Sequence, residues 1–299
     1  MSWTTKDIPT QSGKLAVITG ASGGLGFETA SALVAKGATV IVAARNAEKG
    51  AAAVARLGNR ARFEALDLAD LASVTAFAER LARQGQAVDL LVNNAGLAAP
   101  PKRATTRDGF EIQFGTNFLA HFALTARLLP LLREALSPRV VSVSSIFHKG
   151  TINFADVMSE RSYSPVKSYS QSKLANLIFA RELQRRSDAK GWGLSSMAAH
   201  PGVAATELTK SRPGQPVLWL NRLGDLINPI IGQSAAQGAL AILYAATATE
   251  AEPGGYYGPT GAGERKGPIG IARSTSVSRD PMIAAQLWEA AETLTDLSF

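Results

Sequence analysis

The sequence predicts an α/β fold in which a parallel, doubly wound sheet is covered by helices on both faces. Short runs rich in Val, Ile and Leu alternate along the chain with longer helical patterns, as βαβα units require. These apolar runs lack strict polar and apolar alternation, which is typical of strands buried on both faces. A sheet of this kind, here with about seven strands, binds ligands beyond the carboxyl ends of its strands.

The first two thirds of the chain hold the clearest elements. The apolar runs that predict strands are 15–19, 39–44, 89–93 and 139–144. The patterns that predict helices between them lie near 25–36, 47–57, 70–84 and 109–134. Further strands are expected before Asp67 and before His200, so the βαβα order extends to about residue 206.

The last third departs from this rhythm. Three prolines interrupt apolar helical pieces over about 207–232, which predicts a helical lid outside the sheet. A helix near 233–246 and a strand with a turn at GGYYGP follow. A last helix is predicted to begin with Asp280 as its N-cap and Pro281 at its first position.

Composition limits the classes of function. The 299 residues carry a formal net charge of +7, but Lys and Arg are spread along the chain, so no nucleic-acid partner is expected. There is no cysteine, which excludes disulfides and thiolate chemistry. No run of 18 uncharged apolar residues and no signal-peptide pattern is present. We therefore expect one domain over 1–299, without an integral membrane segment and located in the cytoplasm.

A glycine-rich turn follows the first predicted strand. Residues 19–26 read TGASGGLG and lead directly into a helix. The glycines at 20, 24 and 26 allow a tight turn and let backbone N–H groups approach a pyrophosphate at the positive end of that helix. Its place after the first strand of a βαβ unit favours a nucleotide-binding site.

The stretch YSPVKSYSQSK, residues 163–173, contains two tyrosines that are each followed four residues later by a lysine. Ser164 and Pro165 are typical of a helix N-cap and first helical position. Tyr163 would then lie before the helix, whereas Tyr169 and Lys173 would share one helix face. A fixed cation beside a tyrosine favours its ionised form, so this pair is the candidate for proton transfer.

The spacing T-G-x-x-x-G-x-G resembles the short-chain dehydrogenase/reductase superfamily. NNAG at 93–96, YSQSKLAN at 169–176 and HPGVAAT at 200–206 also match that superfamily, and the matches span residues 13–206 in the right order. The resemblance implies a Rossmann-type fold and an NAD(P)-dependent oxidoreductase. The long connection between Ser145 and Tyr169 is similar to the branch that contains retinol dehydrogenases, WW-domain oxidoreductase and protochlorophyllide reductase-like proteins.

The resemblance implies a set of catalytic residues. Tyr169 would be the general acid and base, and Lys173 would lower its pKa and hold the nicotinamide ribose. Ser145 would hold the substrate carbonyl, with Ser144 as the alternative if the match is displaced by one residue. Asn117 would hold a water in a proton relay to the lysine. In this family the hydride comes from the cofactor.

The resemblance also implies a cofactor site formed by the turns that follow several of the predicted strands. Asp67 would accept from the adenine amino group, and the Val203 backbone and Thr206 hydroxyl would bind the nicotinamide carboxamide. Arg45 stands where an NAD enzyme would carry an acid, so NADP(H) is favoured over NAD. The full candidate set is Gly20, Ser22, Gly24, Leu25, Gly26, Arg45, Asp67, Leu68, Asn94, Ala95, Gly96, Tyr169, Lys173, Pro201, Gly202, Val203 and Thr206.

The favoured function is an NADP(H)-dependent oxidoreductase that interconverts hydrophobic or aromatic ketones or aldehydes and their alcohols. Two alternatives are an enoyl (C=C) reductase on the same fold and a nucleotide-sensing protein without turnover. The histidines show no metal-ligand spacing, so no metal is expected. His121 is expected to be a packed helix residue, and His148 could edge the substrate pocket. A homodimer or homotetramer is expected from the family.

Overall fold

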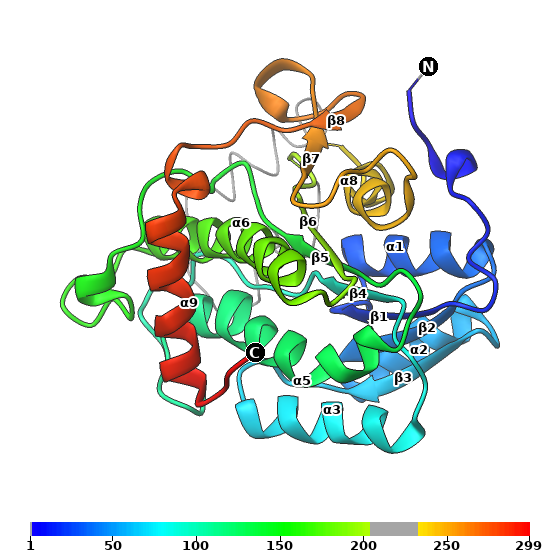
Figure 1. Ribbon diagram of the computed structural model, residues 1–299, viewed down its shortest axis with the longest axis horizontal. Coiled ribbons are helices and arrows are strands. Elements are labelled where there is room, and N and C mark those ends of the chain that lie inside the picture. The colour runs from blue at the N-terminus through cyan, green and yellow to red at the C-terminus, as the bar shows by residue number, and fades with distance from the viewer. Residues whose placement is uncertain (1, 204–232) are drawn as a thin grey trace.

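The protein is built around one sheet in which all strands but the last are parallel (Figure 1). The computed structural model describes residues 2–203 and 233–299. The strands lie in the order β3-β2-β1-β4-β5-β6-β7-β8. They are β1 (Leu15–Thr19), β2 (Thr39–Ala44), β3 (Ala61–Ala65), β4 (Leu90–Asn93), β5 (Arg139–Val143), β6 (Ser195–Ala199), β7 (Tyr256–Pro259) and β8 (Ile269–Ile271). The predicted doubly wound parallel sheet is confirmed, with eight strands because a short antiparallel β8 follows β7.

The direction of winding changes at β1. The chain runs outward from β1 through β2 to β3, and then returns to pair β4 with the other side of β1. Strands of a parallel sheet all end on the same edge, so the turns after β1 and β4 meet there. Such a switch point is the usual ligand crevice of this architecture.

Helices cover both faces of the sheet. One hydrophobic core lies beneath α1, α2 and α8, and the other lies beneath α3, α5, α6 and α9 (Figure 1). The α-helices are α1 (Gly24–Ala35), α2 (Ala47–Leu57), α3 (Leu71–Gln84), α4 (Ile112–Phe114), α5 (Ala120–Arg133), α6 (Pro165–Lys190), α8 (Ala235–Thr247) and α9 (Pro281–Thr295). The short 3-10 turns are η1 (Thr5–Asp7), η3 (Phe154–Asp156), η5 (Ala262–Glu264) and η6 (Val277–Arg279).

Two helix starts predicted from proline are confirmed. Helix α6 begins at Pro165 after Ser164, and α9 begins at Pro281 after Asp280. The Asp280 carboxylate accepts two backbone N–H groups of the first turn of α9, whereas the Ser164 side chain makes no such bond. The lid predicted over 207–232 lies outside the described residues.

The continuous helix predicted over 109–134 is wrong in detail. The helix begins after Glu111, whose carboxylate caps the turn by accepting the N–H of Phe114 at 2.8 Å. A π-helical turn, η2 (Gly115–Leu119), then interrupts it before α5. Insertions of this kind are frequent at functional sites because they displace one residue from the regular hydrogen-bond ladder. Here that turn contains Asn117.

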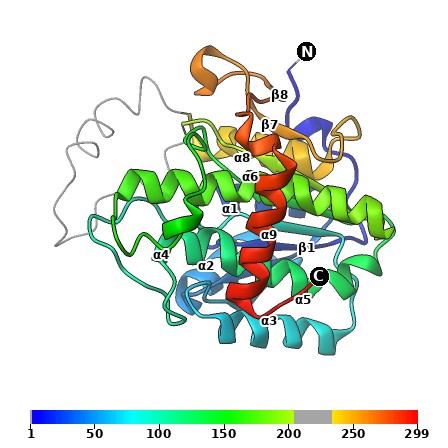
Figure 2. The ribbon, with the colours of Figure 1, turned by 60° about the vertical axis from the view of Figure 1, so that its left-hand side comes forward.

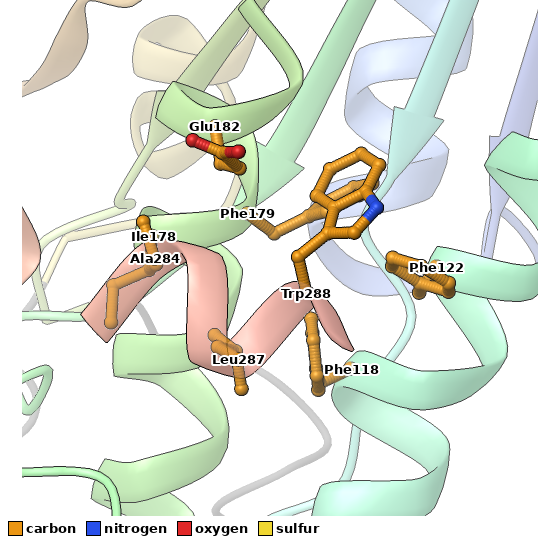
Figure 3. Close-up of a pocket in the computed structure, with 8 residues that line it drawn as sticks. All are labelled: Phe118, Phe122, Ile178, Phe179, Glu182, Ala284, Leu287 and Trp288. Carbon is orange, nitrogen blue, oxygen red and sulfur yellow. The ribbon is translucent and has the colours of Figure 1, made fainter. Parts of the chain in front are cut away.

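The last helix completes the core on the α6 face. Figure 2 shows α9 crossing α6, and Figure 3 shows Trp288 of α9 among aromatic rings. Trp288 is 2% exposed, and its ring centroid lies 5.1 Å from that of Phe122 and 5.8 Å from that of Phe179. The guanidinium of Arg186 lies 4.2 Å from the indole centroid. The surrounding side chains are close-packed, so this contact is structural rather than a ligand site.

Candidate active site

The candidate catalytic side chains come from three elements that meet at the carboxyl edge of the sheet. Asn117 lies in η2, Ser145 follows β5, and Tyr169 and Lys173 lie in α6. Gly96, after β4, lies between two of them: a Cβ built there would be 3.0 Å from Asn117 Oδ1 and 3.4 Å from Lys173 Nζ. A side chain at this position would therefore press on both groups, which accounts for the glycine.

The two tyrosines of the 163–173 stretch have different surroundings. Tyr163 precedes α6, and its hydroxyl donates to the backbone carbonyl of Pro100 at 2.7 Å. Tyr169 lies within α6, and Lys173 Nζ is 5.9 Å from the centroid of its ring. The geometry thus separates a tyrosine that ties a loop to the helix from a tyrosine that shares a helix face with a lysine.

Lys173 is buried at the centre of the site. Its Nζ donates to the carbonyl of Val143 at 3.0 Å, and its own carbonyl accepts from the Ser144 hydroxyl at 2.7 Å. The Asn176 amide also donates to Val143, at 3.1 Å. Burial lowers the pKa of Lys173 to about 8. The ammonium therefore remains mostly protonated at neutral pH but loses its proton more readily than an exposed lysine.

The pKa of Tyr169 is raised by burial, and the nearby Ser145 hydroxyl opposes that shift. Lys173 is not among the groups that perturb it. The shift is therefore opposite in direction to the lowering of the tyrosine pKa that was expected from the lysine. Desolvation disfavours the phenolate more than the neighbouring hydroxyl favours it, because a buried charge loses its hydration.

Asn117 is held by a complete set of hydrogen bonds. Its Oδ1 accepts from the N–H of Leu97 at 2.9 Å, and its Nδ2 donates to the Leu97 carbonyl at 3.0 Å and to the Ser172 hydroxyl at 2.9 Å. These bonds tie η2 to the loop after β4 and to α6. The side chain is thereby fixed in position beside Lys173 rather than free to rotate.

His121 and Thr19 extend this network toward the glycine-rich turn. The Asn117 carbonyl can only accept, so the His121 Nδ1–H donates to it at 2.9 Å. His121 Nε2 must then accept from the Thr19 hydroxyl, also at 2.9 Å. Thr19 Oγ1 in turn accepts the N–H groups of Asn94 and Ala95. His121 is packed as expected, but it also links the cofactor turns to Asn117.

Sequence reasoning did not assign a role to Thr19. The sequence position of Thr19 could have indicated such a role, because the threonine ends the first strand and begins the TGASGGLG turn. A hydroxyl at that point can accept from the backbone of the neighbouring strand's turn, which a purely apolar residue could not do. What could not be foreseen from spacing was its histidine partner, which comes from a helix far along the chain.

Burial keeps two of the histidines neutral, and this predicts acid sensitivity. The pKa of His121 is lowered from 6.5 to about 4 by burial, with Lys173 adding to the shift, and the pKa of His200 is likewise lowered to about 4. Between pH 6.5 and 4 the unfolded chain therefore binds more protons than the folded one, so stability falls as pH falls. His121 is expected to reduce the free energy of unfolding by about 2 kcal/mol at pH 5 relative to neutral pH.

Urea unfolding at pH 7.5 and pH 5.0 measures this loss, and His121→Gln provides the comparison. The glutamine amide can still donate to Asn117 and accept from Thr19, but it does not titrate. The variant should lose about 2 kcal/mol less on acidification than the parent protein, while other titrating groups affect both equally. An identical pH dependence in the two proteins would show that His121 is not held neutral.

Ser145 is fixed by contacts from both sides. Its Oγ accepts the N–H of Phe147 at 3.2 Å, which leaves the hydroxyl hydrogen available for another acceptor. Its carbonyl accepts from His148 Nδ1 at 2.7 Å and from the Tyr256 hydroxyl at 3.2 Å. His148 is buried and supports Ser145 from behind, a role that the expected pocket-edge position did not include. Ser144, the alternative, bonds to the Lys173 carbonyl instead.

The glycine-rich turn has the form of a phosphate cradle. Gly20 and Gly24 have φ of 70° and 54°, in the left-handed region that favours glycine. A Cβ on Gly26 would lie 2.6 Å from Asn94 Nδ2, so the helix can approach the β4 turn only because Gly26 lacks a side chain. Helix α1 begins after Gly23 without a side-chain cap. Its first N–H groups can therefore bind an anion.

The turns around the cradle contain the other residues expected to bind cofactor. Asn94 Nδ2 donates to the Thr19 carbonyl at 2.7 Å. The Asp67 carboxylate accepts the N–H of Ala69 at 3.0 Å, which fixes the turn after β3. Of the other expected cradle and adenosine-side residues, Leu25 lies in the first turn of α1, and those in the turns after β1, β3 and β4 are Ser22, Leu68, Ala95 and Gly96. Arg45 is exposed just after β2.

The predicted nicotinamide end lies after β6. Gly202 has a φ of 65°, and a Cβ there would lie 2.3 Å from the Arg265 carbonyl. The Val203 N–H donates to that same carbonyl at 2.9 Å, so it is already paired in this structure, and the Val203 carbonyl accepts one bond from within the described residues, from the N–H of Gln233. Pro201 is partly buried beside them. Thr206 lies outside the described residues.

The family follows from a sequence comparison. The profile of the short chain dehydrogenase family matches residues 14–216, which include every candidate catalytic residue. The chain belongs to the short-chain dehydrogenase family. It is 40% identical to polyprenol dehydrogenase from Mus musculus over 300 residues, covering 96% of this chain and 85% of that protein. It is 41% identical to retinol dehydrogenase 12 from Mus musculus over 247 residues, covering 81% of this chain and 75% of that protein.

Solved structures agree with this assignment. A crystal structure of an uncharacterized protein from Mycobacterium paratuberculosis is 40% identical, has a TM-score of 0.83, and covers 100% of this chain and 99% of that one. A 3-ketoacyl-(acyl-carrier-protein) reductase from Brucella melitensis, complexed with NADH, is 22% identical, has a TM-score of 0.64, and covers 82% and 96% of the two chains. The second likeness supports the fold alone.

These comparisons confirm the resemblance to short-chain dehydrogenases and to the branch with retinol dehydrogenases. The short-chain dehydrogenase described here is therefore an oxidoreductase of a family that uses NAD(P). No described helix is both long and apolar enough to cross a membrane. The described residues also contain no cluster of three or more His, Cys, Asp or Glu side chains suited to a metal ion.

Proposed function

We propose that this short-chain dehydrogenase is NADP(H)-dependent and interconverts a hydrophobic or aromatic ketone or aldehyde and its alcohol. The observation that carries the proposal is the meeting of Tyr169, Lys173, Ser145 and Asn117 beside a glycine cradle at the sheet's switch point. The polyprenol and retinol dehydrogenases among the relatives bear names of lipophilic alcohols, which supports a hydrophobic substrate.

The cradle after β1 fits the pyrophosphate of a dinucleotide, because its glycines bring backbone N–H groups within reach and α1 lacks a side-chain cap. Asp67 would face the adenine, Lys173 the nicotinamide ribose, and the turn at 201–203 together with Thr206 the carboxamide. When bound, the cofactor supplies or accepts the hydride. The side chains of this protein would carry out the proton transfers and stabilise the charge on the substrate oxygen.

In the direction of reduction, Tyr169 donates its hydroxyl proton to the substrate oxygen while that oxygen gains charge. The Ser145 hydroxyl donates a second hydrogen bond to the same oxygen and stabilises the charge, since Ser145 Oγ is held by the Phe147 N–H and its hydrogen is free to point elsewhere. Lys173 would then return a proton toward Tyr169 and regain one through a water held at Asn117. Its pKa near 8 suits that exchange at neutral pH.

The raised pKa of Tyr169 affects reduction of a carbonyl and oxidation of an alcohol differently. A protonated tyrosine is the form needed for reduction, and burial keeps it protonated at neutral pH. Oxidation of an alcohol needs the phenolate, so we expect the oxidation rate to increase with pH in the alkaline range while the reduction rate does not. The positive charges of Lys173 and of an oxidised nicotinamide ring would favour the phenolate, and would therefore reduce the difference between the pH dependences of the two directions.

The test is a turnover assay with purified protein. NADPH or NADH is mixed with aromatic ketones, aldehydes, steroids, retinal and a polyprenal, and the loss of reduced cofactor is followed. Turnover with formation of an alcohol supports the proposal. On an enone, a saturated ketone product would instead identify a C=C reductase. Tight cofactor binding without turnover in either direction would favour a nucleotide-sensing protein.

Arg45 provides the test of cofactor choice. Its exposed guanidinium at the end of β2 would pair with the 2′-phosphate of NADP(H), which NAD(H) lacks. Arg45→Gln is expected to raise the KM for NADPH about tenfold and to leave the KM for NADH nearly unchanged, because a charge-assisted bond at an exposed site is weakened by solvent. Arg133→Gln, at an exposed position at the end of α5, is the charge-matched control. Equal effects on both cofactors would contradict this assignment.

Several further expectations belong to the same proposal. The 1–299 chain would be one domain, and the protein would be cytoplasmic and a homodimer or homotetramer. Each follows from the sequence patterns and the family. Size-exclusion chromatography with light scattering measures the oligomer directly.

A further inference from the structure

Figures 1 and 2 show α6 beside the segment that runs from β7 through β8 to α9. A second cleft, lined by residues of α6 and of this segment, contains none of the candidate catalytic side chains. Its volume is about 520 Å³. Three arginines, Arg181, Arg273 and Arg279, line it together with one carboxylate, Glu252. The lining therefore has an excess of positive charge, and neither Glu252 nor any other described carboxylate forms an ion pair with the three guanidinium groups.

Arg181 is held in a fixed orientation. Its Nη1 donates to the carbonyl of Ser278 at 3.0 Å and to the Ser278 hydroxyl at 2.8 Å, and its Nη2 donates to the Ser274 hydroxyl at 3.1 Å. A guanidinium has five N–H groups, so these bonds leave the Nε–H and one Nη2–H without a partner among the described residues. Both of these N–H groups can still donate to the oxygens of an anion.

The neighbouring groups add donors rather than acceptors. The Ser274 hydroxyl accepts from Arg181, and its own hydrogen has no acceptor among residues 2–203 and 233–299. Arg273 and Arg279 are exposed, and their guanidinium groups make no hydrogen bond in that part of the chain. Glu264, which lies nearby, accepts the backbone N–H of Arg273 at 2.7 Å, not its side chain.

The like charges act against one another in the absence of an anion. Burial lowers the pKa of Arg181, and the charge of Arg279 lowers it further. An anion between them would relieve this repulsion. The cleft also has an apolar border, formed by Tyr256, Tyr257, Ala272 and the exposed Ile271, which suits the organic part of a ligand.

We propose that this cleft binds the phosphate group of a phosphate monoester, with the free N–H groups of Arg181 and the side chains of Arg273, Arg279 and Ser274 as donors. A phosphate presents three oxygens to separate donors, whereas a carboxylate presents two, and three arginines with a hydroxyl exceed what a carboxylate can accept. The volume exceeds that of inorganic phosphate alone. The site is independent of the proposed oxidoreductase chemistry, because none of its donors is a candidate catalytic or cofactor residue.

The test uses the full chain and the double variant Arg273→Gln with Arg279→Gln. Both positions are exposed, so the variant should fold. Isothermal titration with glycerol 3-phosphate, at constant ionic strength in chloride, measures binding of a soluble phosphate monoester. Co-sedimentation with phosphatidylcholine vesicles, with and without phosphatidic acid, measures binding of a lipid headgroup that is a phosphate monoester. The control double variant, Arg83→Gln with Arg133→Gln, removes the same charge at positions that do not line the cleft.

We expect the double variant to bind at least ten times more weakly than the parent, in whichever assay detects binding, and the control to bind as the parent does. Binding of glycerol 3-phosphate identifies a small-molecule ligand. Binding only to vesicles that contain phosphatidic acid identifies a headgroup. No binding in either assay overturns the proposal, and so does equal weakening in the control, since that result would reflect overall charge alone.

Discussion

Replacing Tyr169 by phenylalanine is expected to lower kcat about a thousandfold and to leave cofactor affinity nearly unchanged. The substitution removes only the phenolic hydroxyl, so the ring keeps its packing beside Phe147, at 6.5 Å between centroids. Without the hydroxyl no group of the site can donate the proton to the substrate oxygen, since Ser145 does not ionise in this range. Steady-state kinetics with the best substrate, together with fluorescence titration of NADPH, measures both quantities.

Tyr163 offers a matched control for this experiment. Tyr163→Phe also removes one phenolic hydroxyl six residues away in the same stretch, but that hydroxyl donates to the Pro100 carbonyl and lies before α6. We expect a small loss of stability and less than a tenfold change in kcat, because a neutral hydrogen bond contributes about 1 kcal/mol. Comparable losses of kcat in the two variants would refute the assignment of Tyr169, and normal turnover in Tyr169→Phe would refute the mechanism.

Replacing Trp288 by alanine is expected to reduce the free energy of unfolding by about 3 to 5 kcal/mol. The indole is 2% exposed and packs against Phe122, Phe179 and Phe299 with ring centroids 4.6 to 5.8 Å away. Its removal leaves a cavity between α5, α6 and α9 that these rigid rings cannot fill. Figure 3 shows how the indole projects from α9 between the two other helices. Urea denaturation followed by circular dichroism measures the change.

Met282 on the same helix is the control for Trp288. Its side chain is 80% exposed, so Met282→Ala should change stability by less than about 0.5 kcal/mol. Because α6 carries Tyr169 and Lys173, a protein that loses Trp288 should also lose turnover when it is assayed near its unfolding midpoint. Equal stability of Trp288→Ala and Met282→Ala would show that α9 contributes little to holding the core on this side of the sheet.

Local sequence signals accounted for the parts of the structure that depend on neighbouring residues. The proline starts of α6 and α9 were predictable because proline restricts its own backbone and lacks an N–H wherever it stands. The separation of Tyr163 from Tyr169 followed from that start. The interruption within 109–134 was not predictable, because the π turn at 115–119 depends on partners of Asn117 that come from distant elements.

Some residues of the candidate site could likewise be selected from the sequence, and others could be found only in the structure. Spacing and family resemblance selected Tyr169, Lys173, Ser145 and Asn117 as candidates, whereas the histidine and threonine that link Asn117 to the glycine-rich turn came only from the fold. The pKa values also needed the structure. The raised pKa of Tyr169 and the lowered pKa of Lys173 arise from burial, which depends on everything packed around the two groups.

The amino-acid sequence by itself determined the order of strands and helices, the glycine cradle and the helix face shared by Tyr169 and Lys173, because these features depend on local backbone preferences and on periodicity. Only the tertiary structure decided which residues support them. The bonds of His148 and Tyr256 to the Ser145 carbonyl, the indole of Trp288 against α6 and the three arginines of the second cleft all join segments far apart in the chain. Such contacts arise from packing, and no local pattern records them.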